Sequence, residues 1–360
     1  MRKYLDKSVY DAAKERIAFI FDEFENVIVS TSSGKDSTCV YNLCLEEAVR
    51  RNRKLGVFFL DQEAEYEHTV ILMRKMMNHP NVIPYWFQVP VYMTNATSYI
   101  DDLLFAWGEG EEWIRPKEDI AIKAINEDYP KRFYGFFNYL EKKMNNTAFV
   151  LGLRADESLN RYRAVTRNAG YKGKNWSTKT KNKTTFRFNP IYDWGVGDVW
   201  KYISDNNIEY NRVYDLMYMN NHGIYNTMRV SNLVHEKSFK CLSDLQKLEP
   251  QTYAKLIDRI GGIDVAARYA EREYLYNVDE LPKSFKNWKE YRDYLLKTAP
   301  ISDDKKERMI KRFNKHPQEE EIFKQHCKQV LINDWENNIP ININKPNKKK
   351  EIIEKWWDVL

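Results

Sequence analysis

The sequence has few cysteines and no cysteine motif. No C-x-x-C spacing connects the four cysteines, which are Cys39, Cys44, Cys241 and Cys327. Cysteine alone therefore supplies neither a zinc site nor a four-cysteine iron–sulfur cluster, and no iron–sulfur cluster is expected. The six histidines also lack metal-ligand spacing. This composition is typical of a protein in a reducing cytoplasm.

The sequence also lacks long hydrophobic runs and a strong charge of one sign. Acidic residues interrupt every apolar run of the N-terminal segment, which predicts neither a signal peptide nor a membrane span, and no later run is long enough to cross a bilayer. We expect no membrane partner. The net charge of +5 comes from 57 basic and 52 acidic residues and does not by itself imply nucleic acid.

What is present is enough apolar material for a sizeable core. Hydrophobic residues make up 43% of the 360 residues and aromatic residues 14%, which predicts a globular protein. A chain of this length normally forms two domains, or one domain with a large extension.

Helical and β-branched patterns alternate along the first part of the chain. A helix is predicted over 8–24, a short β-branched strand in the following NVIVSTSS, and a further helix and the strand LGVFFL after it. This order favours an α/β fold with a doubly wound, mainly parallel sheet over residues 1–207. The pattern over 208–360 is chiefly helical, which predicts an α-rich C-terminal region of unknown role.

A polar loop joins the first predicted strand to a helix. Small hydroxyl residues and a glycine before a helix present backbone N–H groups and the positive helix end to an anion. Lys35 adds a point charge, and Asp36 is expected to hold a metal ion or to orient loop amides. The candidate nucleotide-binding residues of the loop are Ser30, Ser32, Ser33, Gly34 and Ser37. The alternative is that the same residues only form a polar cap of the helix. The loop does not match the Walker pattern G-x-x-x-x-G-K-[ST].

Acidic residues follow the second predicted strand. Asp61 is the best placed of them to orient ribose hydroxyls or to share Mg²⁺ with Asp36, because the carboxyl ends of parallel strands meet at one edge of a sheet. Glu63 and Glu65 belong to the same group. The alternative is an N-cap with first-turn acids on the next helix.

Two further segments carry dense charge. The segment GLRADESLNRYRA suits recognition of a phosphate- or sulfate-bearing substrate through Arg154, Asp156, Glu157 and Arg161. A solvated helix start with ion pairs is the alternative. The lysine-rich stretch 170–185 predicts an exposed, mobile loop, in which Lys172–Lys183 and Trp176 suit nucleic acid or polyphosphate, although a merely solvated loop is equally compatible.

Four segments together carry a family resemblance. STSSGKDS resembles the S-x-S-G-G-K-D-S loop of the PP-loop adenine-nucleotide α-hydrolase superfamily. LGVFFLDQEAEYEHT, GLRADESLNRYRA and NPIYDWGVGDVWKYI resemble, in order, segments of the branch that contains phosphoadenylylsulfate (PAPS) reductases and the ATP sulfurylase small subunit. The resemblance implies that Lys35 and Asp36 are catalytic, that Gly152 contacts the nucleotide, and that the ligand is ATP or a PAPS- or APS-type nucleotide with Mg²⁺.

The helical C-terminal region contains the segment MRVSNLVHEKSFKCLSDLQKLEPQTYAKLIDRIGG and looks most like that of IbrA-like proteins. That likeness implies a fused helical domain and a ParB-like protein partner. Two departures bear on the reaction. Ser33 stands where the family loop has glycine, and Cys327 lies in QHCKQV rather than in an E-C-G-x-H motif. True PAPS reduction is therefore not expected.

The sequence thus favours an enzyme that transfers an adenylyl group from ATP to an unknown acceptor and releases pyrophosphate. A non-catalytic nucleotide sensor that acts through a protein or nucleic acid is one alternative. A nucleic-acid-modifying enzyme that uses the lysine-rich loop is another.

Overall fold

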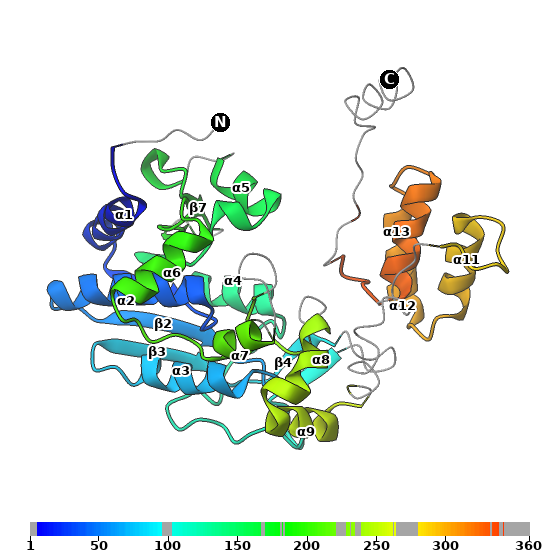
Figure 1. Ribbon diagram of the computed structural model, residues 1–360, viewed down its shortest axis with the longest axis horizontal. Coiled ribbons are helices and arrows are strands. Elements are labelled where there is room, and N and C mark those ends of the chain that lie inside the picture. The colour runs from blue at the N-terminus through cyan, green and yellow to red at the C-terminus, as the bar shows by residue number, and fades with distance from the viewer. Residues whose placement is uncertain are drawn as a thin grey trace. The chain divides into compact units, whose positions relative to one another are not determined.

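The computed structural model places most of the chain in two compact units. It describes residues 6–95, 103–166, 170–180, 182, 184–220, 228–230, 232–234, 239–261, 263, 280–331, 333–337 and 341. The first unit comprises residues 1–94 and 103–261, and the second comprises residues 95–102 and 262–360. Figure 1 shows the elements of both units and labels many of them.

The first unit is built on a mainly parallel sheet. In the described residues the strand order is β3-β2-β1-β6-β8-β7, and every neighbouring pair is parallel except β7 with β8. The strands are β1 (Asn26–Ser30), β2 (Leu55–Leu60), β3 (Val82–Phe87), β6 (Thr147–Leu151), β7 (Ser177–Lys179) and β8 (Thr185–Phe188). A separate antiparallel pair is formed by β4 (Val91–Thr94) and β5 (Leu103–Ala106).

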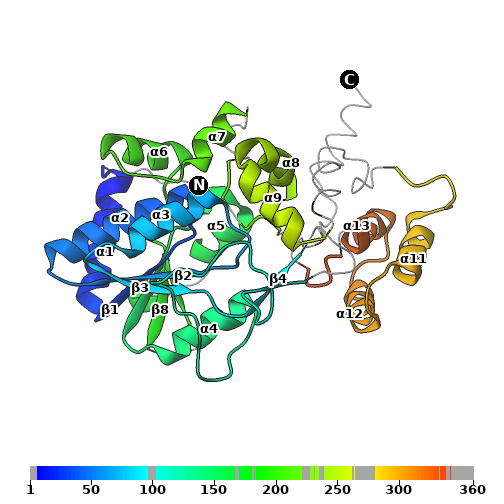
Figure 2. The same cartoon turned by 90° about the horizontal axis from the view of Figure 1, so that it is seen from below.

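Helices cover both faces of this sheet, as Figure 2 shows. One face packs against a group of four helices, which are α1 (Val9–Glu23), α2 (Lys35–Arg50), α3 (Glu67–Met77) and α6 (Val196–Asp205). The opposite face packs against α4 (Phe133–Lys143), whose Phe136 and Phe137 contact Phe58 of β2. Every residue of β2 is buried, because successive side chains point to opposite faces and both faces are covered. The predicted doubly wound α/β fold is confirmed.

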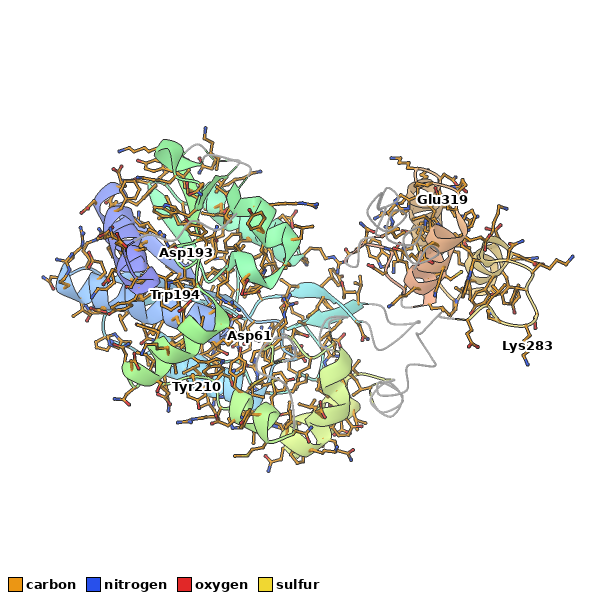
Figure 3. All side chains as sticks on the ribbon, turned by 45° about the horizontal axis from the view of Figure 1, so that its top comes forward. Asp61, Asp193, Trp194, Tyr210, Lys283 and Glu319 are labelled. Carbon is orange, nitrogen blue, oxygen red and sulfur yellow. The ribbon has the colours of Figure 1, made fainter. Side chains whose placement is uncertain are left out.

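Local sequence accounts for the ends of several elements. Ser8 caps α1 by accepting a hydrogen bond from the Asp11 backbone N–H. Asp198 of α6 accepts the backbone N–H of Gly195 at 2.7 Å. Trp194, labelled in Figure 3, is buried and donates its indole N–H to the Val9 carbonyl at 3.0 Å, so this tryptophan joins α1 to the start of α6.

The helical residues after 207 fall in both units. Of these, α7 (Val213–Met219), α8 (Phe239–Leu248) and α9 (Pro250–Arg259) belong to the first unit, which also contains the earlier helix α5 (Leu159–Thr166). The second unit contains α11 (Trp288–Thr298), α12 (Asp303–Phe313) and α13 (Glu320–Leu331), which enclose a small core that includes Met309, Phe313 and Val330. The helical C-terminal region is confirmed, while the division after residue 207 stays a prediction.

The lysine-rich stretch differs from the expected mobile loop. Residues Tyr171–Gly173 form a 3-10 turn, and Ser177–Lys179 form β7 at the edge of the sheet. Trp176 is buried against Phe188, and Lys172 pairs with Glu23 at 2.6 Å. The contact between Trp176 and Phe188 holds this part of the stretch against the sheet. Because Trp176 is buried, neither face of its ring is exposed for stacking on a base. Lys181 and Lys183 lie outside the described residues.

Candidate functional site

The polar loop between β1 and α2 is held by its own side chains. The hydroxyl of Thr31 accepts the Ser33 backbone N–H at 3.1 Å, and the hydroxyl of Ser37 donates to the Gly34 carbonyl at 2.9 Å. Gly34 is the N-cap residue of α2. The loop therefore directs the first turn of α2, where backbone N–H groups lack intrahelical acceptors, toward the adjoining cavity.

Ser33 adopts a left-handed backbone conformation with φ of 54°. In this region of φ a serine has a higher backbone energy than a glycine, because its Cβ is crowded by the backbone. The Ser33 side chain is buried, and its hydroxyl accepts a hydrogen bond at 2.9 Å from Asn211, which also donates to Thr69 at 2.9 Å. Asn211 thus fixes the loop in this conformation from a position beyond the predicted domain boundary.

Tyr214 of α7 is a second anchor on the loop. Its hydroxyl accepts the Lys35 backbone N–H at 3.0 Å, and the backbone N–H of Val230 lies near enough to influence the pKa of the phenol. The Lys35 ammonium lies 5.6 Å from the centre of the same ring. Burial raises the pKa of Tyr214 well above its ordinary value, so the phenol stays neutral at physiological pH.

One cavity of about 290 Å³ lies beside the loop, within the first unit. Of the predicted site residues, those that line it are Ser32, Gly34, Lys35, Asp36, Ser37, Gly152, Arg154, Asp156, Glu157 and Arg161. The remaining lining residues, which the sequence analysis missed, are Val196, Tyr214, Met228, Arg229 and Val230. Val196 lies in the recognised segment NPIYDWGVGDVWKYI, and Met228, Arg229 and Val230 open the segment that resembles IbrA-like proteins. Neither resemblance gave these residues a role in the site, and Tyr214 lies in no recognised segment.

Gly152 brings the end of β6 directly against the loop. A Cβ atom at this position would lie 2.6 Å from the backbone nitrogen of Ser37 and 2.7 Å from the carbonyl carbon of Asp36. Both distances are shorter than real Cβ contacts, and both atoms are backbone atoms. Glycine is therefore required here because two main chains approach each other closely.

The cavity is rich in paired charges. Asp36 forms ion pairs with Lys35, at 3.2 Å, and with Arg154. Glu157 pairs with Arg161 and lies 3.7 Å from Arg154. Burial and the nearby Arg229 guanidinium lower the pKa of Arg161 from its ordinary value. The lining includes four cationic side chains and three acidic ones, so the cavity suits an anionic ligand.

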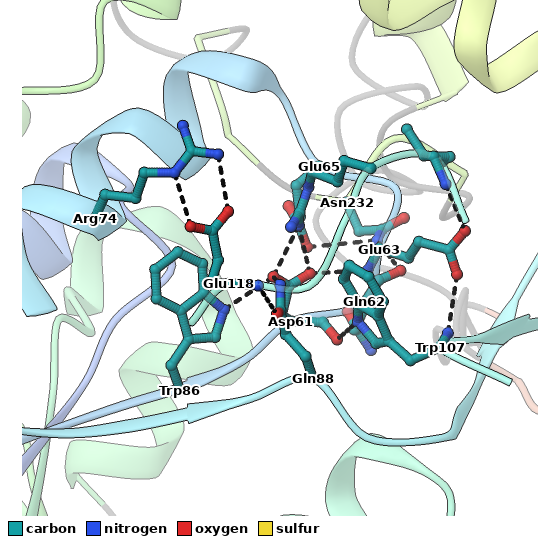
Figure 4. A network of polar contacts seen from close by, with 12 residues as sticks. Asp61, Gln62, Glu63, Glu65, Arg74, Trp86, Gln88, Trp107, Glu118 and Asn232 are labelled. Carbon is teal, nitrogen blue, oxygen red and sulfur yellow. Dashed lines mark hydrogen bonds and ion pairs between the residues drawn. The ribbon is translucent and has the colours of Figure 1, made fainter. Parts of the chain in front are cut away.

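Three predicted residues do not line this cavity. Ser30 ends β1, and the Ser33 side chain turns to Asn211. Asp61 is fully buried in another network, shown in Figure 4. Its carboxylate accepts hydrogen bonds from Trp86 and Gln88, both at 2.9 Å, and pairs with Arg115 at 2.7 Å.

The predicted magnesium ligands are not brought together. Asp36 lines the cavity with both oxygens on cations, whereas Asp61 lies outside the cavity with its carboxylate in the Arg115 network. In the part of the chain that the structure describes, no group of three or more His, Cys, Asp or Glu side chains is arranged to hold a metal ion. The donor set therefore does not fit the expected shared site.

Two acidic neighbours of Asp61, Glu63 and Glu65, are also buried and bound by protein groups. Glu63 is fully buried and accepts the backbone N–H groups of Trp107 at 2.9 Å and Ile114 at 3.1 Å, and it pairs with Arg259 at 2.9 Å. Burial and the nearby Asp61 carboxylate raise the pKa of Glu65 to about 8. These acids therefore shape the turn between β2 and α3 rather than the wall of the cavity.

None of the helices among the described residues combines the length and the apolar character that a bilayer span requires. The three cysteines whose side chains are described, Cys39, Cys44 and Cys327, are buried and free. Burial raises the pKa of Cys327 to about 12. This thiol is therefore protonated at neutral pH and is a poor nucleophile.

The mainly parallel sheet and its serine-rich loop define a doubly wound α/β fold of the adenine-nucleotide α-hydrolase type. The chain belongs to the phosphoadenosine phosphosulfate reductase domain family, whose model matches residues 26–268. A second model, Domain of unknown function (DUF3440), matches residues 223–341. The predicted PP-loop superfamily and its reductase branch are confirmed. The narrower likeness to IbrA-like proteins stays a prediction.

Two curated relatives show how far this similarity extends. "Uncharacterized protein YbdN" of Escherichia coli (strain K12) is 27% identical over 315 residues, which is 82% of this chain and 76% of that protein. Adenosine 5'-phosphosulfate reductase of Lysinibacillus sphaericus (strain C3-41) is 24% identical over 213 residues, which is 58% of this chain and 77% of that protein.

Solved structures match more distantly. The PAPS reductase of Candida auris, in a phosphate complex, is 13% identical with a TM-score of 0.36 over 64% of this chain and 99% of its own. The FMN adenylyltransferase of Candida glabrata, with FMN and an ATP analogue, is 11% identical with a TM-score of 0.36. The match covers 65% of this chain and 66% of that one.

Proposed function

We propose that the cavity beside the polar loop binds ATP or a sulfonucleotide, and that the chain transfers the adenylyl group of ATP to an oxygen nucleophile. The observation that carries this proposal is a single cavity that joins Gly34, the first turn of α2 and the guanidinium of Arg154. Backbone N–H groups, a helix N-terminus and fixed cations all favour phosphate oxygens. Membership of the phosphoadenosine phosphosulfate reductase domain family supports the same ligand class.

In the proposed reaction an oxygen of the acceptor forms a bond to the α-phosphorus of ATP. The bond from the α-phosphorus to the oxygen that bridges the β-phosphorus breaks, and pyrophosphate leaves with the electron pair. A hydroxyl acceptor loses its proton to solvent. Lys35 and the amides at the start of α2 stabilise charge on the leaving pyrophosphate, and Arg154 and Arg161 orient the acceptor.

Asp36 has an orienting role in this proposal. Its carboxylate contacts both Lys35 and Arg154, so it holds the two cations in place before the ligand enters. No step is assigned to a metal ion, because the described carboxylates do not form the expected shared site. Reduction of a sulfonucleotide is not proposed, because Cys327 is buried and protonated.

Pyrophosphate release tests the proposal. The full chain is incubated with labelled ATP, magnesium and candidate acceptors, beside the Lys35→Ala variant and a matched Lys201→Ala variant at an exposed lysine on α6. We expect pyrophosphate from the wild-type chain and from Lys201→Ala, and loss of release in Lys35→Ala. Release from the wild type that does not exceed that of Lys35→Ala would contradict adenylyl transfer.

A second candidate function is a nucleotide sensor without turnover. It is favoured by the internal pairing of the site, because both carboxylate oxygens of Asp36 and the Lys35 backbone N–H already have protein partners. A sensor predicts that ATP or PAPS raises the Tm while no product forms. Product beyond one equivalent of protein would rule this candidate out.

A further inference from the structure

Arg229 is the most exposed part of a short segment in the wall of the candidate cavity. Met228 and Val230 on either side are buried, whereas Arg229 is exposed and lines the cavity. The alternation fixes the direction of the three side chains, because the two apolar neighbours pack inward. An arginine held in this way by its neighbours presents its guanidinium to whatever occupies the cavity.

Arg229 differs in its pairing from the other cations of the cavity. The other three cations of the cavity, Lys35, Arg154 and Arg161, each pair with Asp36 or Glu157. Among the described residues no acidic side chain pairs with Arg229. Arg229 also lies close enough to Arg161 to contribute to the lowered pKa of that group. Two neighbouring guanidinium groups, of which only Arg161 has an acidic partner among the described residues, favour an anion that contacts both.

The segment is anchored on one side by the polar loop. The Tyr214 hydroxyl accepts the Lys35 backbone N–H at 3.0 Å, and the backbone N–H of Val230 lies near the same hydroxyl. Val230 and Tyr214 also line the same cavity, so the neighbour of Arg229 lies close to the first turn of α2. This proximity sets the position of Arg229 relative to the loop.

The segment is anchored on its other side by the acidic turn between β2 and α3. The backbone N–H of Leu233 donates to the Ala64 carbonyl at 2.9 Å, and the Asn232 side chain donates to the Gln62 carbonyl at 3.3 Å. Asn232 also contacts the Glu65 carboxyl at 3.4 Å. The network of Asp61 and Glu63 in Figure 4 holds this turn, so the anchor is a buried and fixed part of the fold.

We infer that Arg229 is a ligand-binding residue that, together with Arg161, receives an anionic phosphate, sulfate or carboxylate group of the ligand. Asn232 and the 62–65 turn are positioning elements for Arg229. The inference rests on the proposed function for the identity of the ligand, and on the cavity alone for the anion. In this inference the buried acids Asp61, Glu63 and Glu65 help to position Arg229 and do not bind ribose or a metal ion.

Binding of three probes to the full chain tests the role of Arg229. The probes are ATP, inorganic pyrophosphate and adenosine, measured by calorimetry for the wild type, Arg229→Gln and the matched control Arg212→Gln, whose arginine is exposed and outside the cavity lining. We expect Arg229→Gln to weaken ATP and pyrophosphate about tenfold or more and to leave adenosine unchanged. Arg212→Gln should match the wild type.

The outcomes separate this inference from the proposed function. Equal ATP and pyrophosphate affinities for Arg229→Gln and the wild type would overturn the inference and leave nucleotide binding standing. Pyrophosphate binding that depends on Arg229, without any ATP binding by the wild type, would overturn the proposed function alone. A wild-type chain that binds neither probe would overturn both.

A double-mutant cycle tests the positioning role of Asn232. Asn232→Ala should weaken ATP several-fold while circular dichroism and the Tm without ligand show a folded chain. If Asn232 acts through Arg229, the Arg229→Gln/Asn232→Ala double variant should bind no more weakly than Arg229→Gln. Additive losses would overturn the positioning role, because a merely structural effect would not depend on Arg229.

Discussion

Gly152 is the residue at which β6 and the polar loop come closest. Gly152→Ala forces a Cβ onto the backbone of Asp36 and Ser37, neither of which moves without disturbing α2. We expect a loss of about 1–3 kcal/mol in the free energy of unfolding, together with weaker ATP binding. Urea denaturation measures the first effect and calorimetry the second.

Gly197 of α6 provides the matched control. No atom lies within 4 Å of a Cβ added there. Gly197→Ala should leave ATP binding unchanged and, because alanine suits a helix better than glycine, should stabilise the chain by up to about 0.5–1 kcal/mol. Equal effects of the two alanines would contradict the close approach at Gly152.

The raised pKa of Glu65 predicts how the free energy of unfolding depends on pH. Its pKa rises from an ordinary value of 4.5 to about 8 because the carboxyl is buried beside Asp61. Below pH 4.5 the group is protonated in both the folded and unfolded states and adds no pH dependence. Between pH 4.5 and 8 the unfolded chain releases the proton and the folded chain keeps it. The wild type therefore loses up to about 1.4 kcal/mol of stability per pH unit over this window.

Glu65→Gln removes this loss, because glutamine is neutral in both states. Relative to the wild type, the variant should gain stability progressively from pH 5 to pH 8 and then stay level. Urea denaturation at several pH values measures the difference. The half-exposed neighbour Glu67, changed to glutamine, is the control and should show no such trend. A stability difference for Glu65→Gln that does not change with pH would contradict the raised pKa.

At the scale of elements, α3 receives its N-terminal cap from a distant residue. The buried Glu249 accepts the backbone N–H groups of Glu67 at 2.7 Å and His68 at 3.2 Å, and it also contacts the His68 ring at 2.7 Å. A carboxylate at a helix N-terminus satisfies free N–H groups and interacts favourably with the helix dipole. The α8–α9 junction thereby docks on α3 of the sheet layer.

Glu249→Ala should lower the free energy of unfolding by about 2 kcal/mol, because hydrogen bonds to a charged group are lost and N–H groups are left without partners. Hydrogen exchange should show faster exchange at the first-turn amides of α3. Gln251→Ala, at an exposed position in α9, is the control and should change neither quantity. Unchanged protection of those amides in Glu249→Ala would argue against the cap.

At the scale of the whole molecule, the cavity lies within the first compact unit. All its lining residues fall between Ser32 and Val230. A chain shortened to residues 1–261 should therefore keep ATP affinity within about threefold of the full chain. A chain shortened to 1–207 loses Asn211, Tyr214 and Arg229, and should not bind ATP.

Calorimetry on both shortened chains measures these affinities, with circular dichroism to confirm that each is folded. Binding by the 1–207 chain would support the boundary predicted from the sequence. Loss of binding by a folded 1–261 chain would mean that the second unit contributes to ligand binding.

The sequence by itself determined the first strands of the sheet and the polar loop after β1, although not the edge strand β7. Alternating β-branched runs and helical periods fixed β1, α2 and β2, and the small polar residues before Lys35 marked the helix N-terminus. These features are local, because spacing and residue type act within a few positions. The segment that contains Arg154 and Arg161 was found in the same way and lines the predicted cavity.

Only the tertiary structure decided which acidic residues, and which residues after 207, line the cavity. Asp61 and Asp36 follow neighbouring strands, yet Arg115 and Trp86 bind Asp61 in a separate buried network. Tyr214 and Arg229 enter the wall through contacts between residues far apart in sequence. The Lys35 backbone N–H and the Tyr214 hydroxyl are 179 positions apart, and the Asn232 side chain and the Gln62 carbonyl are 170 apart. Such contacts depend on chain packing rather than on local pattern, so sequence spacing gave no sign of them.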